Sequence, residues 1–591
     1  MDTPFNEEQK QYLQGFMAGV VQRGGLAFAG ETPAGQITAD RADAARDLAD
    51  PPVDTLHGFP LDEVTKQERI KLEKDPHAMW DEVVANARAG RMPEGDDVFR
   101  YKAFGLFNVA PIQHGFMLRM RIPGCHLRAD QLRGIARIAD AYGRGYGDVT
   151  TRGNLQLREI QPEHAADTLI ALSDLGLTSK GAGADNLRNI TASPTAGFDP
   201  QELADVRPLA TSMHHYILHS PDLYGLPRKF NIAFDGGGRI STAADTNDLG
   251  FFAVEVPETD AGVEPGLWYR IELGGITGHQ SFAADTGFMV REHEVVAAAA
   301  AVVRVYLRNG DRTNRKKARL IYLLEDWGVE RFMAEVQDVL AFPLTSFPRE
   351  ACAPRPPVVR HSHVGVHAQR QPGRSYVGVV VPVGRMTSSQ MRGLADLAGR
   401  YGSGDLRLTI FQNVLIPDVP DADVPAVQDG LRAVGFGTET EDVRSGLVAC
   451  TGGAGCPYAN TLTKEHAVVI GDHLAATVPL DQPINIHFTG CPNSCAQHYC
   501  GDIGLLGVKV KAETGEKVDG ATVVLGGGMD EDQGIGRELV KAVPITDVPT
   551  LLERVLLTYL DRREGDESFA AFTRRHSEAD LKALFLDPAA A

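Results

Sequence analysis

The pattern of apolar and polar positions becomes regular after residue 115. Over residues 116–122 every second side chain is apolar, which predicts a β-strand with one apolar face. Apolar positions at helical spacing over residues 132–142 predict an amphipathic helix, with Gly143 placed to cap its C-terminus. Residues 148–160 alternate again, so we expect a second strand with Val149 and Leu155 on its apolar face.

The same order of elements recurs further along the chain. Five residues reappear at a separation of 259, as the pairs Pro123 and Pro382, Gln131 and Gln390, Tyr142 and Tyr401, Asn154 and Asn413, and Gly176 and Gly435. Four later pairs are separated by 252 to 254 residues: Asn231 and Asn485, Asp248 and Asp502, Leu273 and Leu525, and Tyr306 and Tyr559. A slowly drifting offset indicates an internal duplication, with two α/β halves of about 220 residues each. A solenoid would need three or more short repeats, so we expect an α+β (mixed α/β) fold with two halves packed about a pseudo-two-fold axis.

Four of the seven cysteines form two closely spaced pairs. Cys450 and Cys456 make a C-x5-C pair, and Cys491 and Cys495 make a C-x3-C pair, on segments rich in Gly and Pro. Four thiolates on such loops are typical of iron–sulfur clusters. Zinc fits less well because its paired cysteines are usually two to four residues apart, and unrelated buried cysteines are the remaining alternative. The other three cysteines are expected to be small buried residues rather than ligands: Cys125, Cys352 and Cys500.

The two halves differ in the chemistry of their side chains. At matched positions, Arg119 corresponds to Gly378, Arg121 to Val380, and Arg152 to Phe411. One half therefore supplies thiols and the other supplies cations. The simplest geometry that uses both is an active site between the halves.

Composition and charge narrow the class of protein. A chain of 591 residues is too long for one core and should divide into two to four domains. Its hydrophobic share of 43% and charged share of 23% are typical of a globular enzyme, and no apolar run reaches the roughly 18 residues of a membrane span. The net charge of −19 argues against non-specific nucleic-acid binding. Free cysteines, and acidic residues where a signal peptide would be basic, predict a cytoplasmic location.

The cysteine segments also carry a family resemblance. The stretches CTGGAGCP at residues 450–457 and TGCPNSCAQ at residues 489–497 resemble the signature of the sirohaem-containing nitrite and sulfite reductases. The resemblance extends from about Phe116 to about Asp566. It implies a [4Fe–4S] cluster on the four cysteines and a sirohaem, with Cys495 also ligating the sirohaem iron.

The resemblance implies a division into subdomains as well. We expect an N-terminal extension that wraps the core, with helices that the sequence itself indicates at residues 7–21 and 78–89. In each repeat we then expect a ferredoxin-like half-domain and a larger domain. The larger domain of the first repeat would bind sirohaem and substrate, and that of the second would bind the cluster and sirohaem. The expected bounds are residues 1–110 for the extension, 111–183 and 184–345 for the first repeat, and 370–443 and 444–591 for the second.

Motifs of the family place the active-site residues in the first half. The family pattern implies substrate-binding cations at Arg119, Arg188 and Lys229, with Asn231 two residues after the lysine. That position is typically Asn in nitrite reductases and Lys in sulfite reductases, so Asn231 favours nitrite. The sirohaem contacts that we expect are Arg152, Asn154, Gln156, Arg228, Asn493 and Cys495.

Together these features predict a cytoplasmic, monomeric ferredoxin–nitrite reductase that makes ammonium from nitrite in six one-electron steps. We find no Gly-rich dinucleotide fingerprint, so we expect no bound flavin and no direct use of NAD(P)H. An assimilatory sulfite reductase is the alternative within the class. A non-catalytic or corrinoid-pathway iron–sulfur protein is the alternative from another class, and it would lack the Arg119, Arg188 and Lys229 set.

One basic segment, residues 312–319, is a candidate docking site for an acidic ferredoxin. It contains four cations within six residues, from Arg312 to Lys317, and a fifth at Arg319. The alternatives are a solvated loop that leads into a helix, or a set of partners for the carboxylates of sirohaem.

Overall fold

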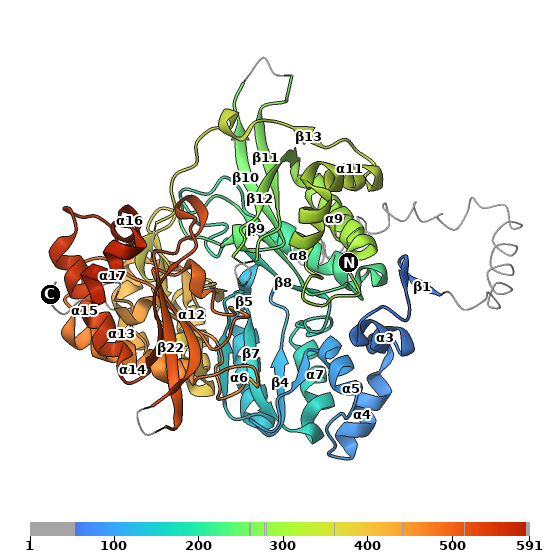
Figure 1. Cartoon of the computed structure of the whole chain (residues 1–591), viewed down its shortest axis with the longest axis horizontal. Coiled ribbons are helices and arrows are strands. Elements are labelled where there is room, and N and C mark those ends of the chain that lie inside the picture. Colours follow the sequence, from blue (N-terminus) through green and yellow to red (C-terminus); the bar gives the residue numbers. More distant parts are fainter. Residues whose placement is uncertain are drawn as a thin grey trace, which may run out of the picture.

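The structure is a computed structural model that describes residues 54–258, 262–276, 278, 280–359, 361–439, 443–512 and 515–586. The helix that the sequence predicts at residues 7–21 lies outside the described residues. Figure 1 shows the ferredoxin-like halves in the centre, with one larger domain above them and the other beside them. No helix among the described residues is both long enough and apolar enough to cross a membrane.

The two ferredoxin-like halves repeat the same elements. In the first half these are β4 (Phe116–Arg119), α6 (Ala129–Tyr142), β6 (Tyr146–Val149), β7 (Leu155–Ile160) and α7 (Ala165–Asp174). In the second they are β15 (Arg374–Val379), α12 (Ser388–Tyr401), β17 (Asp405–Leu408), β18 (Val414–Pro420) and α13 (Val424–Ala433). Helices α6 and α12 begin 259 residues apart, as do β6 and β17, so the duplication that the sequence predicts is confirmed.

The halves are joined by an exchange of short strands. Strand β5 (His126–Arg128) of the first repeat pairs with β17 of the second, and β16 (Arg385–Thr387) of the second pairs with β6 of the first. Arg133 and Asp396 form an ion pair between α6 and α12 at 2.8 Å. Residues of both halves, such as Leu118 and Leu406, belong to one buried apolar cluster, which fixes the halves relative to each other.

Each half leads into a larger domain built on a mixed sheet. The sheet of the first repeat has the order β13-β12-β11-β10-β9-β8, made of β8 (Leu187–Ala192), β9 (Phe230–Asp235), β10 (Leu249–Val256), β11 (Gly266–Leu273), β12 (Ala284–Val290) and β13 (Thr345–Ser346). The helices of this domain are α8 (Arg207–Leu218), α9 (Val295–Asn309), α10 (Leu320–Trp327) and α11 (Val329–Val339). Strands β8, β9 and β10 are parallel neighbours, with α8 between β8 and β9 as the crossover. All six residues of β9 are buried, as a strand covered on both faces requires.

The second repeat builds the corresponding sheet in the order β19-β20-β21-β22-β23. Its strands are β19 (Leu447–Ala449), β20 (Ile486–Thr489), β21 (Ile503–Lys511), β22 (Lys517–Leu525) and β23 (Arg537–Pro544), and its helices are α14 (Thr463–Thr477), α15 (Val548–Arg562), α16 (Phe569–Arg575) and α17 (Glu578–Leu586). Each of the two larger domains has a core of its own. Strand β14 (Gly365–Ala368) follows the linker between the repeats and forms an antiparallel hairpin with β15.

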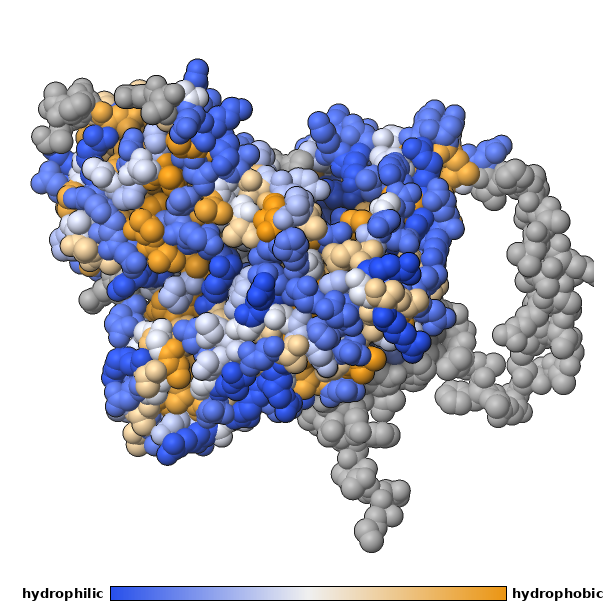
Figure 2. Space-filling model, turned by 90° about the horizontal axis from the view of Figure 1, so that it is seen from below, coloured by the Kyte–Doolittle hydropathy of each residue, from blue (hydrophilic) through white to orange (hydrophobic). Residues whose placement is uncertain are grey.

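The described part of the N-terminal segment packs on the first repeat. It consists of β1 (Thr55–Leu56), β2 (Phe59–Pro60), α3 (Lys66–Glu73), α4 (Trp80–Arg88), α5 (Asp97–Arg100) and β3 (Leu106–Asn108). Helix α4 lies where the sequence predicts a helix at residues 78–89. Glu68 of α3 forms a buried ion pair with Arg312 at 2.5 Å, and β3 adds an edge strand beside β4. On the face that Figure 2 shows, hydrophilic residues predominate, with several groups of apolar residues among them.

Two predicted strands are shorter than expected. The strand predicted over residues 148–160 is a hairpin of β6 and β7, because a tight turn at residues 150–154 interrupts it. In this turn the N–H of Gly153 donates to the carbonyl of Thr150 at 3.0 Å, and Gly153 has a φ of +50°. Strand β4 ends at Arg119, and Arg121 forms only a single bridge with Thr178.

Candidate active site

The four cysteines of the two pairs lie on two neighbouring loops of the second repeat. Cys450 directly follows β19, and Cys491 follows β20 by one residue. Because β19 and β20 are parallel neighbours, their carboxyl ends meet at the same edge of the sheet. The N–H of Gly490 donates to the sulfur of Cys450 at 3.2 Å, which joins the two loops directly.

Small residues allow the close approach of these loops. A Cβ atom on Gly490 would lie 2.7 Å from the Cβ of Ala459, so a larger residue would push the loops apart. Gly452 has a φ of +67°, and a Cβ there would lie 2.5 Å from the backbone nitrogen of Thr463. The Thr463 hydroxyl then donates to the carbonyl of Cys450 at 2.6 Å, which fixes the first ligand residue to the start of α14.

The thiols interact with one another electrostatically. Burial raises the pKa of Cys450 to about 11, and it also raises the pKa values of Cys456 and Cys491. In all three cases Cys495 adds to the increase, so its sulfur lies within electrostatic reach of the other three. Four thiolates in this position need a positively charged group such as iron to stabilise them.

Among the described residues, no group of three or more His, Cys, Asp or Glu side chains converges closely enough to bind a single metal ion. A four-iron cluster places a different iron at each of its four thiolates, so its cysteines need not converge on one point. The chemistry of the four thiols therefore fits a cluster better than zinc.

The first repeat directs cations toward Cys495. Arg119 lies at the end of β4, Arg152 in the turn between β6 and β7, and Lys229 directly before β9. Burial lowers the pKa of Arg119 and of Arg152 to about 10, and that of Lys229 to about 7. Cys495 acts in the opposite direction on all three pKa values, which places its sulfur within their electrostatic reach.

These cations also affect one another. Arg319, Arg188 and Arg152 lower the pKa of Lys229 further, after burial. Burial and then the nearby Arg119 lower the pKa of Arg188 well below its ordinary value. Positive charge is therefore in excess at this place, which suits an anionic ligand.

Two buried polar atoms at this place have no hydrogen-bond partner in the part of the chain that the structure describes. They are the Nε of Arg188 and the Oδ1 of Asn231. The other nitrogens of the Arg188 guanidinium donate to the carbonyls of Ala182 and Ala184 at 3.0 and 2.6 Å, which fixes its orientation. Unpaired polar atoms in a buried position are costly unless a ligand or water meets them.

Arg121 holds the loop that leads into β8, where Arg188 is the second residue, a role that the sequence reasoning missed. Its guanidinium is buried and donates to the carbonyls of Lys180, Gly181, Leu187 and Arg188, at 2.6 to 3.1 Å. Its donors are therefore occupied by the backbone. Asn189 adds a second link, since its side chain donates to the carbonyl of Arg152 at 3.1 Å.

A turn at residues 244–248 connects the cations to the cysteine loops, and sequence reasoning did not identify it as part of the site. Asn247 accepts from Arg152 at 2.7 Å, and Thr246 accepts from Gln497, two residues after Cys495, at 2.8 Å. Asp248 accepts from the backbone N–H of Asn231 at 2.9 Å and from the guanidinium of Arg319 at 2.7 Å. The repeat match between Asp248 and Asp502 was the signal that could have found this turn.

The remaining predicted cofactor contacts have different surroundings. The side-chain amide of Asn154 donates to the carbonyl of Met120 at 2.6 Å and accepts from the N–H of Leu155 at 2.7 Å. Gln156 is the strand partner of Arg119 in the β4–β7 pairing. Arg228 is one-third exposed and lies 3.7 Å from Asp185. Asn493 lies in the loop between Cys491 and Cys495, and its side chain donates to the sulfur of Cys491 at 3.5 Å.

The basic segment 312–319 is not the exposed patch that the sequence suggested. Arg312 is buried against Glu68, and Arg319 is buried against Asp248. Arg315 makes a bidentate pair with Asp185 at 2.7 Å. Only Lys316 and Lys317 of its five cations are exposed. The other three hold different segments: Arg312 holds the N-terminal segment, Arg315 the loop before β8, and Arg319 the turn at residues 244–248.

Two family models match the chain, each in both repeats. The one described as the nitrite and sulphite reductase 4Fe-4S domain matches residues 183–344 and 442–574. The one described as the nitrite/sulfite reductase ferredoxin-like half domain matches residues 111–175 and 367–434.

Individual relatives cover most of the chain. The ferredoxin–nitrite reductase of Synechococcus elongatus is 37% identical over 87% of this chain and 98% of its own length. The protein named sulfite reductase [ferredoxin] 2 of Mycolicibacterium paratuberculosis is 33% identical over 79% of this chain and 83% of its own. Among solved structures, the NirA protein of Mycobacterium tuberculosis matches with a TM-score of 0.80 and 30% identity, over 88% of this chain and 97% of that one.

Proposed function

The chain belongs to the nitrite and sulphite reductase family, and from this we propose that it reduces nitrite to ammonium with electrons from a reduced ferredoxin. The relatives named ferredoxin–nitrite reductase, from cyanobacteria and plants, support both the substrate and the donor. The observation that carries the proposal is the excess of cations from the first repeat within reach of Cys495 of the second.

The family carries a sirohaem and a [4Fe–4S] cluster, and the residues of this chain fit both groups. Four thiols on two joined loops suit the cluster: Cys450, Cys456, Cys491 and Cys495. Cys495 would be shared with the sirohaem iron. When bound, the two groups supply electron transfer and a coordination site for the substrate.

The carboxylates of the tetrapyrrole need basic and polar partners. For this role we propose the predicted contacts Arg152, Asn154, Gln156, Arg228 and Asn493. Arg152 is the best supported because it is half-buried and its guanidinium is oriented by its hydrogen bond to Asn247. Asn154 is the least supported, since its amide is already used to hold β4 beside the hairpin.

Arg119 and Arg188 would bind the substrate anion. A guanidinium stays charged at any physiological pH and donates in a fixed planar geometry, so it orients an oxyanion well. In a buried site of low dielectric, the same charges favour negative charge that develops on an oxygen as its bond to nitrogen breaks.

Lys229 would move protons. Its pKa of about 7 lies near neutral pH, so the ammonium can give up a proton and regain one from water. Such a group can protonate each of the two nitrite oxygens that leave as water. Arginine cannot take this role because it does not lose its proton.

Asn231 would favour nitrite over sulfite. Its Oδ1 is buried and unpaired, and its backbone N–H is fixed by Asp248. An asparagine adds no charge, which suits a monoanion better than the dianionic sulfite. Sulfite reduction is the second candidate, because the mycobacterial relative named as a sulfite reductase is 33% identical.

We further propose that the protein is cytoplasmic and monomeric. Its seven free cysteines are consistent with a reducing compartment. A non-catalytic or corrinoid-pathway relative would not need Arg119, Arg188 and Lys229 together, so their presence supports the enzyme.

The experiment is a comparison of nitrite and sulfite turnover by the purified enzyme, supplied with reduced ferredoxin, together with its visible spectrum. We expect a haem-like Soret band, iron and acid-labile sulfide, and faster turnover of nitrite. Faster turnover of sulfite would contradict the substrate assignment. Absence of the band and of acid-labile sulfide would contradict the enzyme itself.

A further inference from the structure

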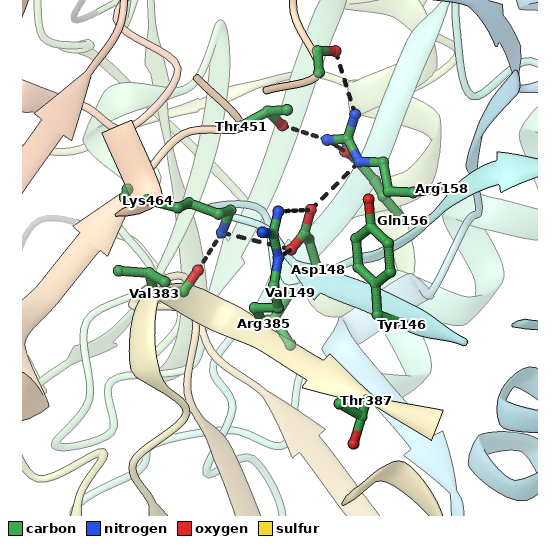
Figure 3. Close-up of polar contacts among 12 residues, drawn as sticks. Tyr146, Asp148, Val149, Gln156, Arg158, Val383, Arg385, Thr387, Thr451 and Lys464 are labelled. Carbon is green, nitrogen blue, oxygen red and sulfur yellow. Dashed lines mark hydrogen bonds and ion pairs between the residues drawn. The ribbon is translucent and has the colours of Figure 1, made fainter. Parts of the chain in front are cut away.

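A buried group of charged side chains lies between the two repeats, beside the loop from Cys450 to Cys456. Asp148 of β6 forms ion pairs with Arg385 of β16 at 3.0 Å, with Arg158 of β7 at 3.3 Å and with Lys464 of α14 at 3.7 Å. Figure 3 shows the three basic groups converging on this one carboxylate. Asp148, Arg158 and Lys464 are at most 3% exposed.

Arg158 extends from this group to the cysteine loop. Its guanidinium donates to the hydroxyl of Thr451 and to the carbonyl of Gly455 at 3.5 Å, and these residues stand next to Cys450 and Cys456 (Figure 3). Gln156 accepts a further bond from it at 3.1 Å. A side chain on the first repeat therefore holds both ends of the C-x5-C loop of the second.

Lys464 approaches the same loop from the other side. Its ammonium donates to the carbonyl of Val383 and interacts electrostatically with the Cys450 thiol. The preceding residue, Thr463, donates to the carbonyl of Cys450 at 2.6 Å. The cysteine loop is thus held between Arg158 and the start of α14.

The charges in this group do not balance. Arg158 and Arg385 each carry the positive charge of a guanidinium group, and Asp148 is the only buried carboxylate paired with them among the described residues. Arg385, which is one-third exposed, also approaches the partly exposed Glu465 at 3.7 Å. With Lys464 protonated, three cations face two carboxylates, so a net positive charge remains beside the loop.

An unbalanced buried cation has a consequence for redox chemistry. In a low dielectric it favours the reduced, more negative form of a nearby redox group. Net charge and hydrogen bonding are among the factors that set the potentials of iron–sulfur clusters. A purely structural ion network would need no excess of one sign.

We propose that Arg158 is a positioning residue that fixes the Cys450–Cys456 loop and raises the reduction potential of the group held by the four cysteines, with Asp148 as the counter-ion that limits this effect. The inference rests on the proposed function only in that the cysteines hold a cluster. It assigns to Arg158 and Asp148 opposite effects on one measurable potential.

The test is a reductive titration of the purified holoenzyme without substrate, followed by low-temperature EPR of the reduced cluster. For Arg158→Gln we expect at least a tenfold shift of the one-electron equilibrium toward the oxidised cluster, which corresponds to about 59 mV. For Asp148→Asn we expect a shift of the opposite sign. Arg158→Lys keeps the charge and should keep the potential, but it should release iron faster to a chelator.

The control is Arg144→Gln, which removes an exposed arginine paired with Glu159 and should leave the potential unchanged. Unchanged potentials in both Arg158→Gln and Asp148→Asn, or shifts of the same sign, would overturn the proposal. If Arg158→Gln loses its cluster, Asp148→Asn decides alone, and an unchanged potential there would overturn it. A wild-type enzyme without a cluster signal would instead contradict the proposed function.

Discussion

Arg119 at the end of β4 and Gly378 in β15 occupy equivalent positions in the two repeats. A Cβ atom at Gly378 would lie 2.5 Å from the carbonyl oxygen of His363, so the second repeat has no room for a side chain there. Arg152 of the first repeat corresponds to Phe411 of the second, whose ring stacks on His363 at 4.3 Å between centroids. The second repeat has replaced cations with close packing.

The difference runs the other way at the cysteine loops. At the offset of 254, Gly237 and Ser241 of the first repeat stand where the second has Cys491 and Cys495. The first repeat thus lacks these thiols, and the second lacks the arginines. On the proposed function, two domains with corresponding sheets would therefore supply different halves of one site.

The largest expected effect comes from removing the residue at which the two repeats meet. Cys495→Ser should lower nitrite turnover to background and remove the haem-like band, since this cysteine is proposed to serve both cofactors. Turnover, iron content and the visible spectrum are the measurements. Cys352→Ser, a partly buried cysteine away from the loops, should leave all three unchanged. Retention of both cofactors without Cys495 would show that the repeats do not meet there.

The next effect tests the contribution of the first repeat. Lys229→Gln should lower kcat/KM for nitrite about 10²–10³-fold, the loss typical of removing one preorganised electrostatic group. The exposed Lys316→Gln is the matched control and should be neutral.

Lys229 should also determine the pH profile. Its pKa is lowered to about 7, so the ammonium form is present below that pH and is lost above it. In the wild type, kcat/KM should therefore fall by about tenfold per pH unit above pH 7. The variant should lack this limb, and a limb that persists in it would assign the titration to another group.

The smallest expected effect concerns the preference of the enzyme for nitrite over sulfite. Asn231→Lys should shift the ratio of sulfite to nitrite turnover at least tenfold toward sulfite, since one charge-assisted hydrogen bond contributes roughly 1.5–3 kcal/mol. Asn231→Ala removes the amide without adding charge and should not produce this shift. An unchanged ratio in Asn231→Lys would remove the main argument for nitrite.

The sequence alone predicted the duplication, because matched residues keep their spacing whatever the local conformation. It also identified the cysteine pairs, whose spacing and glycines are visible without coordinates. It failed at the hairpin of β6 and β7, where polar and apolar residues alternate through a turn that only Gly153 indicates.

Contacts between residues far apart in the chain could not be predicted from the sequence. The sequence indicated that Arg312 and Arg319 belong to a basic docking surface. In the structure they are buried against Glu68 and Asp248, which are distant in the chain. Arg121 was grouped with Arg119 among the cations of the first repeat, but its guanidinium holds the loop that leads into β8 and Arg188. A basic residue does not reveal its partner, and the partner decides its role.

The most direct test of the shared site is a spectral titration of the oxidised enzyme with nitrite, comparing wild type with Arg119→Gln. Arg119 belongs to the first repeat, whereas the cluster cysteines belong to the second. We expect the variant to keep its iron, sulfide and haem-like band while its Kd for nitrite rises at least tenfold; Arg144→Gln should not change this Kd. Unchanged nitrite affinity in Arg119→Gln would contradict the claim that cations of one repeat serve the thiolates of the other.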